Sequence, residues 1–153
     1  MSIKKLSPAG YRALIALEQY VGSAVDPTVR DLVRLRASIL NGCAYCVDLH
    51  SREALRAGED DRRLFAVAAW REAPFFTEPE RAALALTDAV TRLGESGVPD
   101  DVWDEAVKHW SEQEVANLIL AIGMINLWNR IAVSMRTRPV VVHGPDAGRR
   151  SER

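Results

Sequence analysis

The chain has 153 residues, of which 48% are hydrophobic and 27% charged, the size and composition of one ordinary globular domain. This composition excludes wholesale disorder, and a chain of this length can build a hydrophobic core without disulfide staples. The 20 basic and 21 acidic residues give a net charge of -1, so no overall basic excess favours nucleic acid or an anionic membrane.

Neither a secretory signal nor a membrane span is predicted. The first residues, 1–5, are followed by Pro8 and Gly10 rather than by the apolar core of a signal peptide. The longest apolar run, 118–125, is much shorter than the roughly 20 residues that cross a bilayer. We therefore expect a cytoplasmic protein that does not associate with membranes.

Residues typical of helix starts and helix ends recur along the first half of the chain. Ser7-Pro8 and Asp26-Pro27 are typical helix starts, because the first residue can cap the helix and proline suits its first position. Asn41-Gly42 and Gly58 are typical helix ends. With the apolar spacing, these signals predict helices from Pro8, from Pro27 to about 40, over about 43–57 and over about 61–71.

The second half of the chain also reads as helical. Thr77 with Glu80 and Ser111 with Glu114 form capping boxes, which predict helices over about 77–93 and 111–136. A short helix is expected between them, over 99–110. Since residues 140–142 are the only candidate strand, the predicted class is all-α. We expect one helical domain over residues 1–137 and a flexible tail or arm over 138–153.

The last predicted helix is apolar on nearly all sides, since its many apolar residues cannot fit on one stripe. Such a helix must be buried on several sides. A partner subunit would supply part of this burial, so we expect a homo-oligomer. The alternative is the central core helix of a monomeric bundle.

The residues with the strongest chemistry lie together in 41–50. Cys43 and Cys46 lie three residues apart, within disulfide reach if a helix begins at the first of them, and His50 follows four residues later on the same face. In a reducing cytosol such a pair is typical of a catalytic or metal-binding site rather than a structural staple.

A thiolate at this position needs more than the helix dipole. Lowering the pKa of a free thiol from about 8.5 to about 6.5 takes about 2.7 kcal/mol, whereas a helix N-terminus supplies about 0.3–1 kcal/mol. His50 is the nearest proton acceptor or cationic partner. A carboxylate could orient its ring: Asp31 from the preceding helix, or Glu53, which shares the face.

Two other interpretations of the cysteines stay open. A closed zinc site needs four ligands, and the other histidines, His109 and His143, lie far away in the sequence. Two inert buried cysteines would also suit a hydrophobic core. We predict neither a metal nor a cofactor.

Polar residues elsewhere have structural interpretations. Asn126, Asn129 and Arg130 interrupt the apolar final helix, so they are expected to bond between helices or subunits. Arg34 and Arg36 are expected to form ion pairs or to border the site. The four tryptophans are interpreted as core or interface anchors.

Four segments together resemble the alkylhydroperoxidase AhpD-like/carboxymuconolactone decarboxylase family. They are residues 31–50, which contain the Cys-x-x-Cys-x-x-x-His element, and residues 70–74, 77–84 and 126–130. The resemblance covers about residues 7–137. It implies an AhpD-like helical bundle that forms oligomers, and a peroxidase that reduces hydroperoxides with a thiol pair.

The resemblance also implies a role for each site residue. Cys46 matches the cysteine that attacks the peroxide, Cys43 the partner that closes the disulfide, His50 the proton-relay histidine and Asp31 the relay carboxylate. The helix dipole taken alone favours Cys43 as the more acidic thiol. The sequence departs from the family at two positions: Asp31 is one methylene shorter than the usual glutamate, and Tyr45 replaces a second histidine.

The predicted function is therefore a thiol-dependent hydroperoxide reductase, an antioxidant enzyme. Its expected partners are an organic hydroperoxide or hydrogen peroxide, an external dithiol such as a lipoyl protein, and further copies of the chain. One alternative is a redox-sensing or structural oligomer without catalysis. Another is a lactone decarboxylase-like enzyme, although such family members generally lack the thiol pair.

Overall fold

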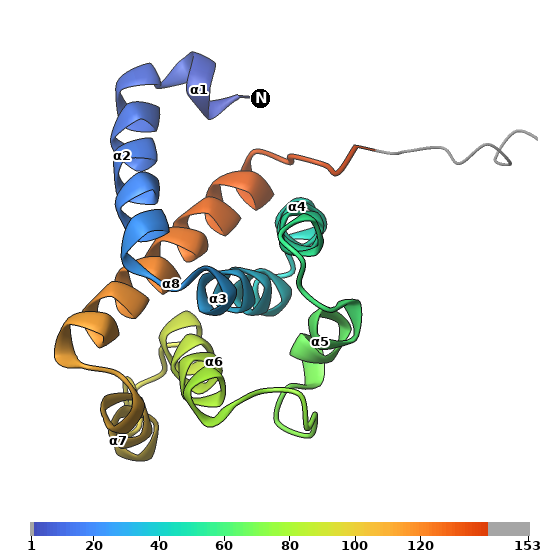
Figure 1. Cartoon of the computed structure of the whole chain (residues 1–153). Helices are drawn as coiled ribbons and strands as arrows, with labels where there is room; N and C mark the ends of the chain where they lie inside the picture. Colours follow the sequence, from blue (N-terminus) through green and yellow to red (C-terminus); the bar gives the residue numbers. More distant parts are fainter. Residues whose placement is uncertain (1, 141–153) are drawn as a thin grey trace, which may run out of the picture.

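The computed structural model describes residues 2–140, which form helices joined by short turns (Figure 1). Within this range no residue belongs to a β-strand, and the one isolated bridge joins Gly94 to Gly97. The helices are α1 (Ile3–Leu6), α2 (Pro8–Ala24), α3 (Pro27–Leu40), α4 (Ala44–Arg56), α5 (Asp61–Ala66), α6 (Glu78–Thr91), α7 (Asp100–His109) and α8 (Glu112–Ser134). The all-α prediction is confirmed.

The predicted helix starts are also confirmed. The Asp26 side chain accepts hydrogen bonds from the backbone N–H groups of residues 28 and 29, so it caps α3. Both capping boxes form, at the start of α6 and at the start of α8. Because each cap satisfies N–H groups that the helix leaves unpaired, these short sequence signals fix where the helices begin. Ser7 precedes α2, but its side chain makes no capping bond.

Two elements differ from the prediction. The helix expected over 61–71 ends at Ala66 and continues as a 3-10 turn, Val67–Ala69. There, the Arg36 guanidinium donates hydrogen bonds to the backbone oxygens of Val67 and Ala68 and so draws these carbonyls out of the α-helical pattern. The sequence analysis also missed α1, which has only four residues and buries none of them.

Helix α3 lies at the centre of the fold and packs against α4, α6 and α8 (Figure 1). One core cluster joins α3 to α2, α6, α7 and α8; its members include Val21, Val33, Leu86, Leu118 and Ile122. A second cluster joins α3 to α4, α5 and α6; its largest members are Leu32, Leu35, Leu64, Trp70, Phe76 and Leu84. The central helix thus holds the two halves of the core together by burying apolar side chains on both sides.

Helix α8 is the long apolar helix that the sequence predicts. By length and composition it could span a membrane, but 56% of its most apolar window is buried within the domain, as in a core helix. Leu120, Leu127 and Val133 remain exposed on it. Homo-oligomerisation, the predicted reason for this surplus of apolar surface, stays a prediction.

The polar residues of α8 bond across to other helices. The side-chain amide of Asn41, at the end of α3, donates to Asn126 Oδ1 at 2.9 Å and to Asn129 Oδ1 at 2.8 Å. Asn126 in turn donates to Thr91 of α6, and Asn129 donates to Ser38 of α3. The interhelical bonds expected of these asparagines are therefore present, and they tie the end of α3 to α8.

The structure does not test the division of the chain at residue 137. Residues 137–140 have no regular secondary structure. The predicted tail continues through 141–153, outside the described residues, as do Val141 and Val142 of the candidate strand.

Replacement of Asn41 by alanine is expected to lower the free energy of unfolding by about 2 kcal/mol, because it removes two hydrogen bonds and leaves the buried Asn129 oxygen without its donor. Urea denaturation followed by circular dichroism measures this. The control is Gln113→Ala, which removes an exposed amide from α8 and should change stability by less than about 0.5 kcal/mol. Equal stability of both variants would contradict the role given to Asn41.

Candidate active site

The turn between α3 and α4 places the two cysteines. Gly42 adopts a positive φ of 64°, which ends α3, and the Cys43 N–H then bonds back to the Ser38 carbonyl at 3.0 Å. Cys43 is the N-cap of α4, one residue before the first turn in which the sequence placed it, and its sulfur accepts a hydrogen bond from the Cys46 N–H at 3.3 Å. The two sulfurs form a disulfide, with the Cα atoms 5.3 Å apart.

The two cysteines differ in whether they line the neighbouring pocket. Both are buried, with relative exposures of 1% for Cys43 and 3% for Cys46. Cys46 nevertheless lines a pocket of about 620 Å³, whereas Cys43 is not among the residues that line it. A small molecule in this pocket would therefore meet Cys46 first.

Helices α1, α2, α3, α4 and α8 all contribute to this pocket. Much of the wall is apolar or aromatic, formed by Tyr11, Ile15, Tyr45, Leu49, Trp128 and Met135. The rings of Tyr11 and Trp128 meet edge to face, with centroids 6.1 Å apart. Such a wall suits an organic group better than a strongly charged ligand.

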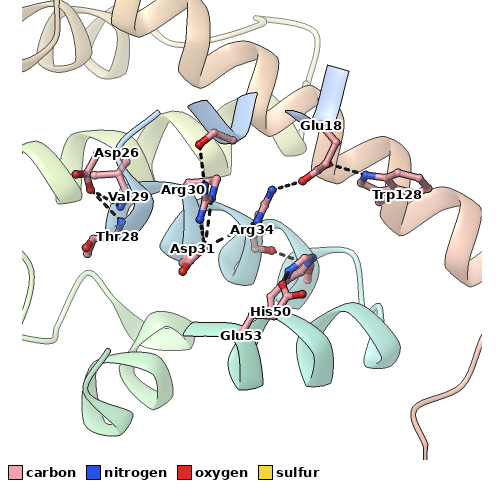
Figure 2. A network of polar contacts seen from close by, with 12 residues as sticks. Glu18, Asp26, Thr28, Val29, Arg30, Asp31, Arg34, His50, Glu53 and Trp128 are labelled. Carbon is pink, nitrogen blue, oxygen red and sulfur yellow. Dashed lines mark hydrogen bonds and ion pairs between the residues drawn. The ribbon is translucent and has the colours of Figure 1, made fainter. Parts of the chain in front are cut away.

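The imidazole of His50, which also lines the pocket, pairs with Glu53 on the next turn of α4 (Figure 2). His50 Nδ1 lies 3.0 Å from Glu53 Oε2. This hydrogen bond lowers the pKa of Glu53; burial opposes the effect, while the charges of His50, Arg34 and Arg30 add to it. An ionised carboxylate can only accept, so Nδ1 carries the hydrogen and Nε2 is the basic nitrogen of the neutral ring.

Asp31 has different partners. Its Oδ1 accepts from Arg30 at 3.4 Å and lies 3.9 Å from Arg34 Nη1 (Figure 2). Asp31 does not line the pocket, and among residues 2–140 no hydrogen bond joins it to His50. The structure thus brings Cys43, Cys46 and His50 to one place and gives the carboxylate contact to Glu53.

A second polar chain closes the other side of the pocket (Figure 2). Arg34 of α3 donates to Glu18 Oε1, and the indole N–H of Trp128 on α8 donates to Glu18 Oε2 at 2.8 Å. Glu18 lies on α2, so one carboxylate joins three helices around the pocket. Glu18 was not predicted as a site residue, because no local sequence pattern marks a residue whose partner is 110 positions away.

Both ion pairs expected of Arg34 and Arg36 are present. Arg34 pairs with Glu18, and Arg36 pairs with Asp88 through two hydrogen bonds, at 2.6 and 3.1 Å. Arg34 also lines the pocket, whereas Arg36 does not. Within residues 2–140 no three His, Cys, Asp or Glu side chains gather where they could hold a metal ion. His143 lies outside this range.

Replacement of Glu18 by alanine is expected to cost about 1–3 kcal/mol of unfolding free energy, because it leaves a half-buried guanidinium and an indole N–H without their acceptor. Thermal or urea denaturation measures it. The matched control is Glu105→Ala on α7, an exposed carboxylate that pairs with Lys108 and His109 and whose loss should change the stability far less. A Glu18→Ala protein no less stable than the control would show that this bridge does not hold the pocket together.

Comparison with known proteins identifies the family of the chain. The sequence profile described as "Carboxymuconolactone decarboxylase family" matches residues 8–89, more than half of the chain. The uncharacterized protein YdfG of Bacillus subtilis is 34% identical over 139 residues, which are 90% of this chain and 95% of that protein.

Solved structures share the fold. A protein of unknown function from Agrobacterium tumefaciens, described as a candidate antioxidant defence protein AhpD, superposes with a TM-score of 0.89 and 43% identity over 93% of this chain and 98% of its own. An uncharacterized peroxidase-related protein from Ralstonia eutropha with an alkylhydroperoxidase AhpD core gives a TM-score of 0.77 at 19% identity, over 88% of this chain and 72% of its own. At that identity the second match speaks for the fold alone.

Proposed function

The chain belongs to the carboxymuconolactone decarboxylase family, and we propose that within it the chain acts as a thiol-dependent hydroperoxide reductase. One observation carries the proposal: a bonded cysteine pair has one member, Cys46, on the wall of a mostly apolar pocket that His50 also lines. The AhpD-like resemblance of the fold supports it.

The proposed reaction begins with the reduced pair. His50 takes the thiol proton of Cys46, and the thiolate attacks the peroxide O–O bond. A sulfur–oxygen bond forms, the O–O bond breaks, and the alkoxide leaves as an alcohol with the proton from His50. The products are a sulfenic acid on Cys46 and one molecule of alcohol.

The second step uses the neighbouring cysteine. The thiol of Cys43 attacks the sulfenic sulfur, the disulfide forms, and the oxygen leaves as water. In the bonded pair, the turn at Gly42 and the start of α4 hold these sulfurs together, with the Cα atoms 5.3 Å apart. An external dithiol then reduces the disulfide by exchange and is itself oxidised.

The aromatic and aliphatic wall favours a hydroperoxide with an organic body as the substrate. Reduction of the disulfide by an external dithiol, self-association and a cytoplasmic location are further parts of the proposal. Neither nucleic acid nor a membrane is expected as a partner. These features follow from the sequence and from the chemistry of the site.

A non-catalytic redox sensor is the second candidate, favoured by the burial of both sulfurs. A bulky dithiol cannot reach a disulfide that is almost fully covered unless the pocket opens, and slow reduction would suit a protein that reports its oxidation state. Such a protein would be oxidised reversibly and change its association, with no repeated turnover of peroxide. A lactone decarboxylase, in contrast, would survive blocking of the thiols.

Replacement of Cys46 by serine is expected to lower the turnover of cumene hydroperoxide, with a small dithiol as reductant, by at least about 100-fold, because it removes the nucleophile. Cys43→Ser should also stop turnover but should still permit one sulfenic acid to form on Cys46, detected by dimedone labelling and mass spectrometry. The two variants serve as controls for each other, since each removes one sulfur. Equal turnover in wild type and Cys46→Ser would contradict the proposal.

A further inference from the structure

We propose that Glu53, rather than Asp31, is the carboxylate that positions the His50 ring for proton transfer; this inference rests on the proposed function. Glu53 is the residue whose carboxylate contacts the ring, at 3.0 Å from Nδ1. In this role it is a positioning residue, because it acts on the reacting sulfur through the imidazole.

The three groups lie in order along one face of α4. Cys46, His50 and Glu53 are spaced by four and then three residues, so they follow one another on successive turns. The relative solvent exposure increases from Cys46 to Glu53: it is 3% for the whole Cys46 residue, 12% for the side chain of His50 and 46% for the side chain of Glu53. All three line the same pocket. Along the helix, His50 therefore comes between a cysteine that is covered and a carboxylate in contact with solvent.

The charges around Glu53 keep it ionised. The hydrogen bond from His50 lowers the pKa of Glu53 below its ordinary value; burial opposes this effect, and the charges of the imidazole and of Arg34 and Arg30 on α3 add to it. On the other walls of the pocket, Glu18 of α2 is already paired with Arg34, and α1 contributes Lys4. A fixed anion at Nδ1 stabilises the imidazolium that forms when Nε2 accepts the thiol proton.

Asp31 is poorly placed for the same task. Its carboxylate is buried between Arg30 and Arg34, and these ion pairs occupy it. It has no hydrogen bond to His50 among the residues that the structure describes, and it lies outside the pocket wall. Asp31 is connected to the pocket through its ion pair with Arg34, which lines the pocket and also pairs with Glu18.

Glu53 therefore favours the thiolate–imidazolium pair over the neutral pair of groups. Without the anion, the proton stays on Cys46 up to a higher pH. The measurable quantity is the pH midpoint of the alkylation of Cys46, which reports on the thiol and the imidazole together. The midpoint of a variant without this charge should rise.

The test compares wild type with Glu53→Gln, Asp31→Asn and Asp48→Asn. The last is the matched control, because Asp48 lies on the same helix and pairs with Arg52 in an exposed position. Each reduced protein reacts with iodoacetamide over a range of pH, and mass spectrometry follows alkylation of Cys46. This reaction needs no peroxide, so it reports on the site even if the enzyme activity is absent. Thermal denaturation confirms that each variant folds.

Glu53→Gln should raise the midpoint by about half a pH unit, an amount in keeping with one charge-assisted hydrogen bond that solvent partly screens. Asp48→Asn should leave it unchanged, and Asp31→Asn should move it by less than half as much. A wild-type midpoint in Glu53→Gln, or a larger shift in Asp31→Asn, would overturn the inference.

Peroxide turnover separates this inference from the proposed function. If wild type reduces cumene hydroperoxide, Glu53→Gln should lower kcat/KM by about tenfold, within the reach of acid–base positioning effects. If wild type shows no turnover while Glu53→Gln still shifts the alkylation midpoint, the proposed function fails and the role of Glu53 in positioning the ring stands.

Discussion

The active-site geometry depends on how the end of α3 is attached to α8. The amide of Asn41 donates to two asparagines of α8, and one of these, Asn129, is almost completely buried. In a low-dielectric core such hydrogen bonds are strong, and a buried amide group without a partner costs free energy. The bonds therefore favour one position of the end of α3 relative to α8. The next residues, Gly42 and Cys43, form the turn into α4. The position of the sulfurs therefore follows from a polar contact outside the pocket.

The site combines small effects, none of which suffices alone. The start of α4 supplies about 0.3–1 kcal/mol toward a thiolate, against the roughly 2.7 kcal/mol needed to lower a thiol pKa by two units. The imidazole of His50 and the anion beside it provide the remainder in the proposed mechanism. In this proposal, the neighbours of the thiol pair on the next two turns of α4 make it reactive.

Much of the fold could be predicted from local signals. Proline, capping residues and the Asn41-Gly42 stop act within a few residues, so they located most helix starts and the end of α3, although not α1 or the end of α5. The spacing of Cys46 and His50 predicted a shared helix face for the same reason. Long-range contacts could not be predicted: the bond from Trp128 to Glu18 and the bonds from Arg36 that end α5 depend on tertiary packing. For the carboxylate, the sequence left Asp31 and Glu53 as alternatives, and the family resemblance indicated Asp31.

The central claim is that Cys43 and Cys46 form a two-electron redox centre for hydroperoxides. A single-turnover experiment tests this claim: the fully reduced protein is mixed with less than one equivalent of cumene hydroperoxide. Intact-mass spectrometry then quantifies the disulfide, and chromatography quantifies the alcohol. The account predicts one molecule of cumyl alcohol for each Cys43–Cys46 disulfide formed, with Cys46 alkylation lost in the same proportion. Disulfide formation without alcohol, or alcohol formation with both thiols intact, would contradict it.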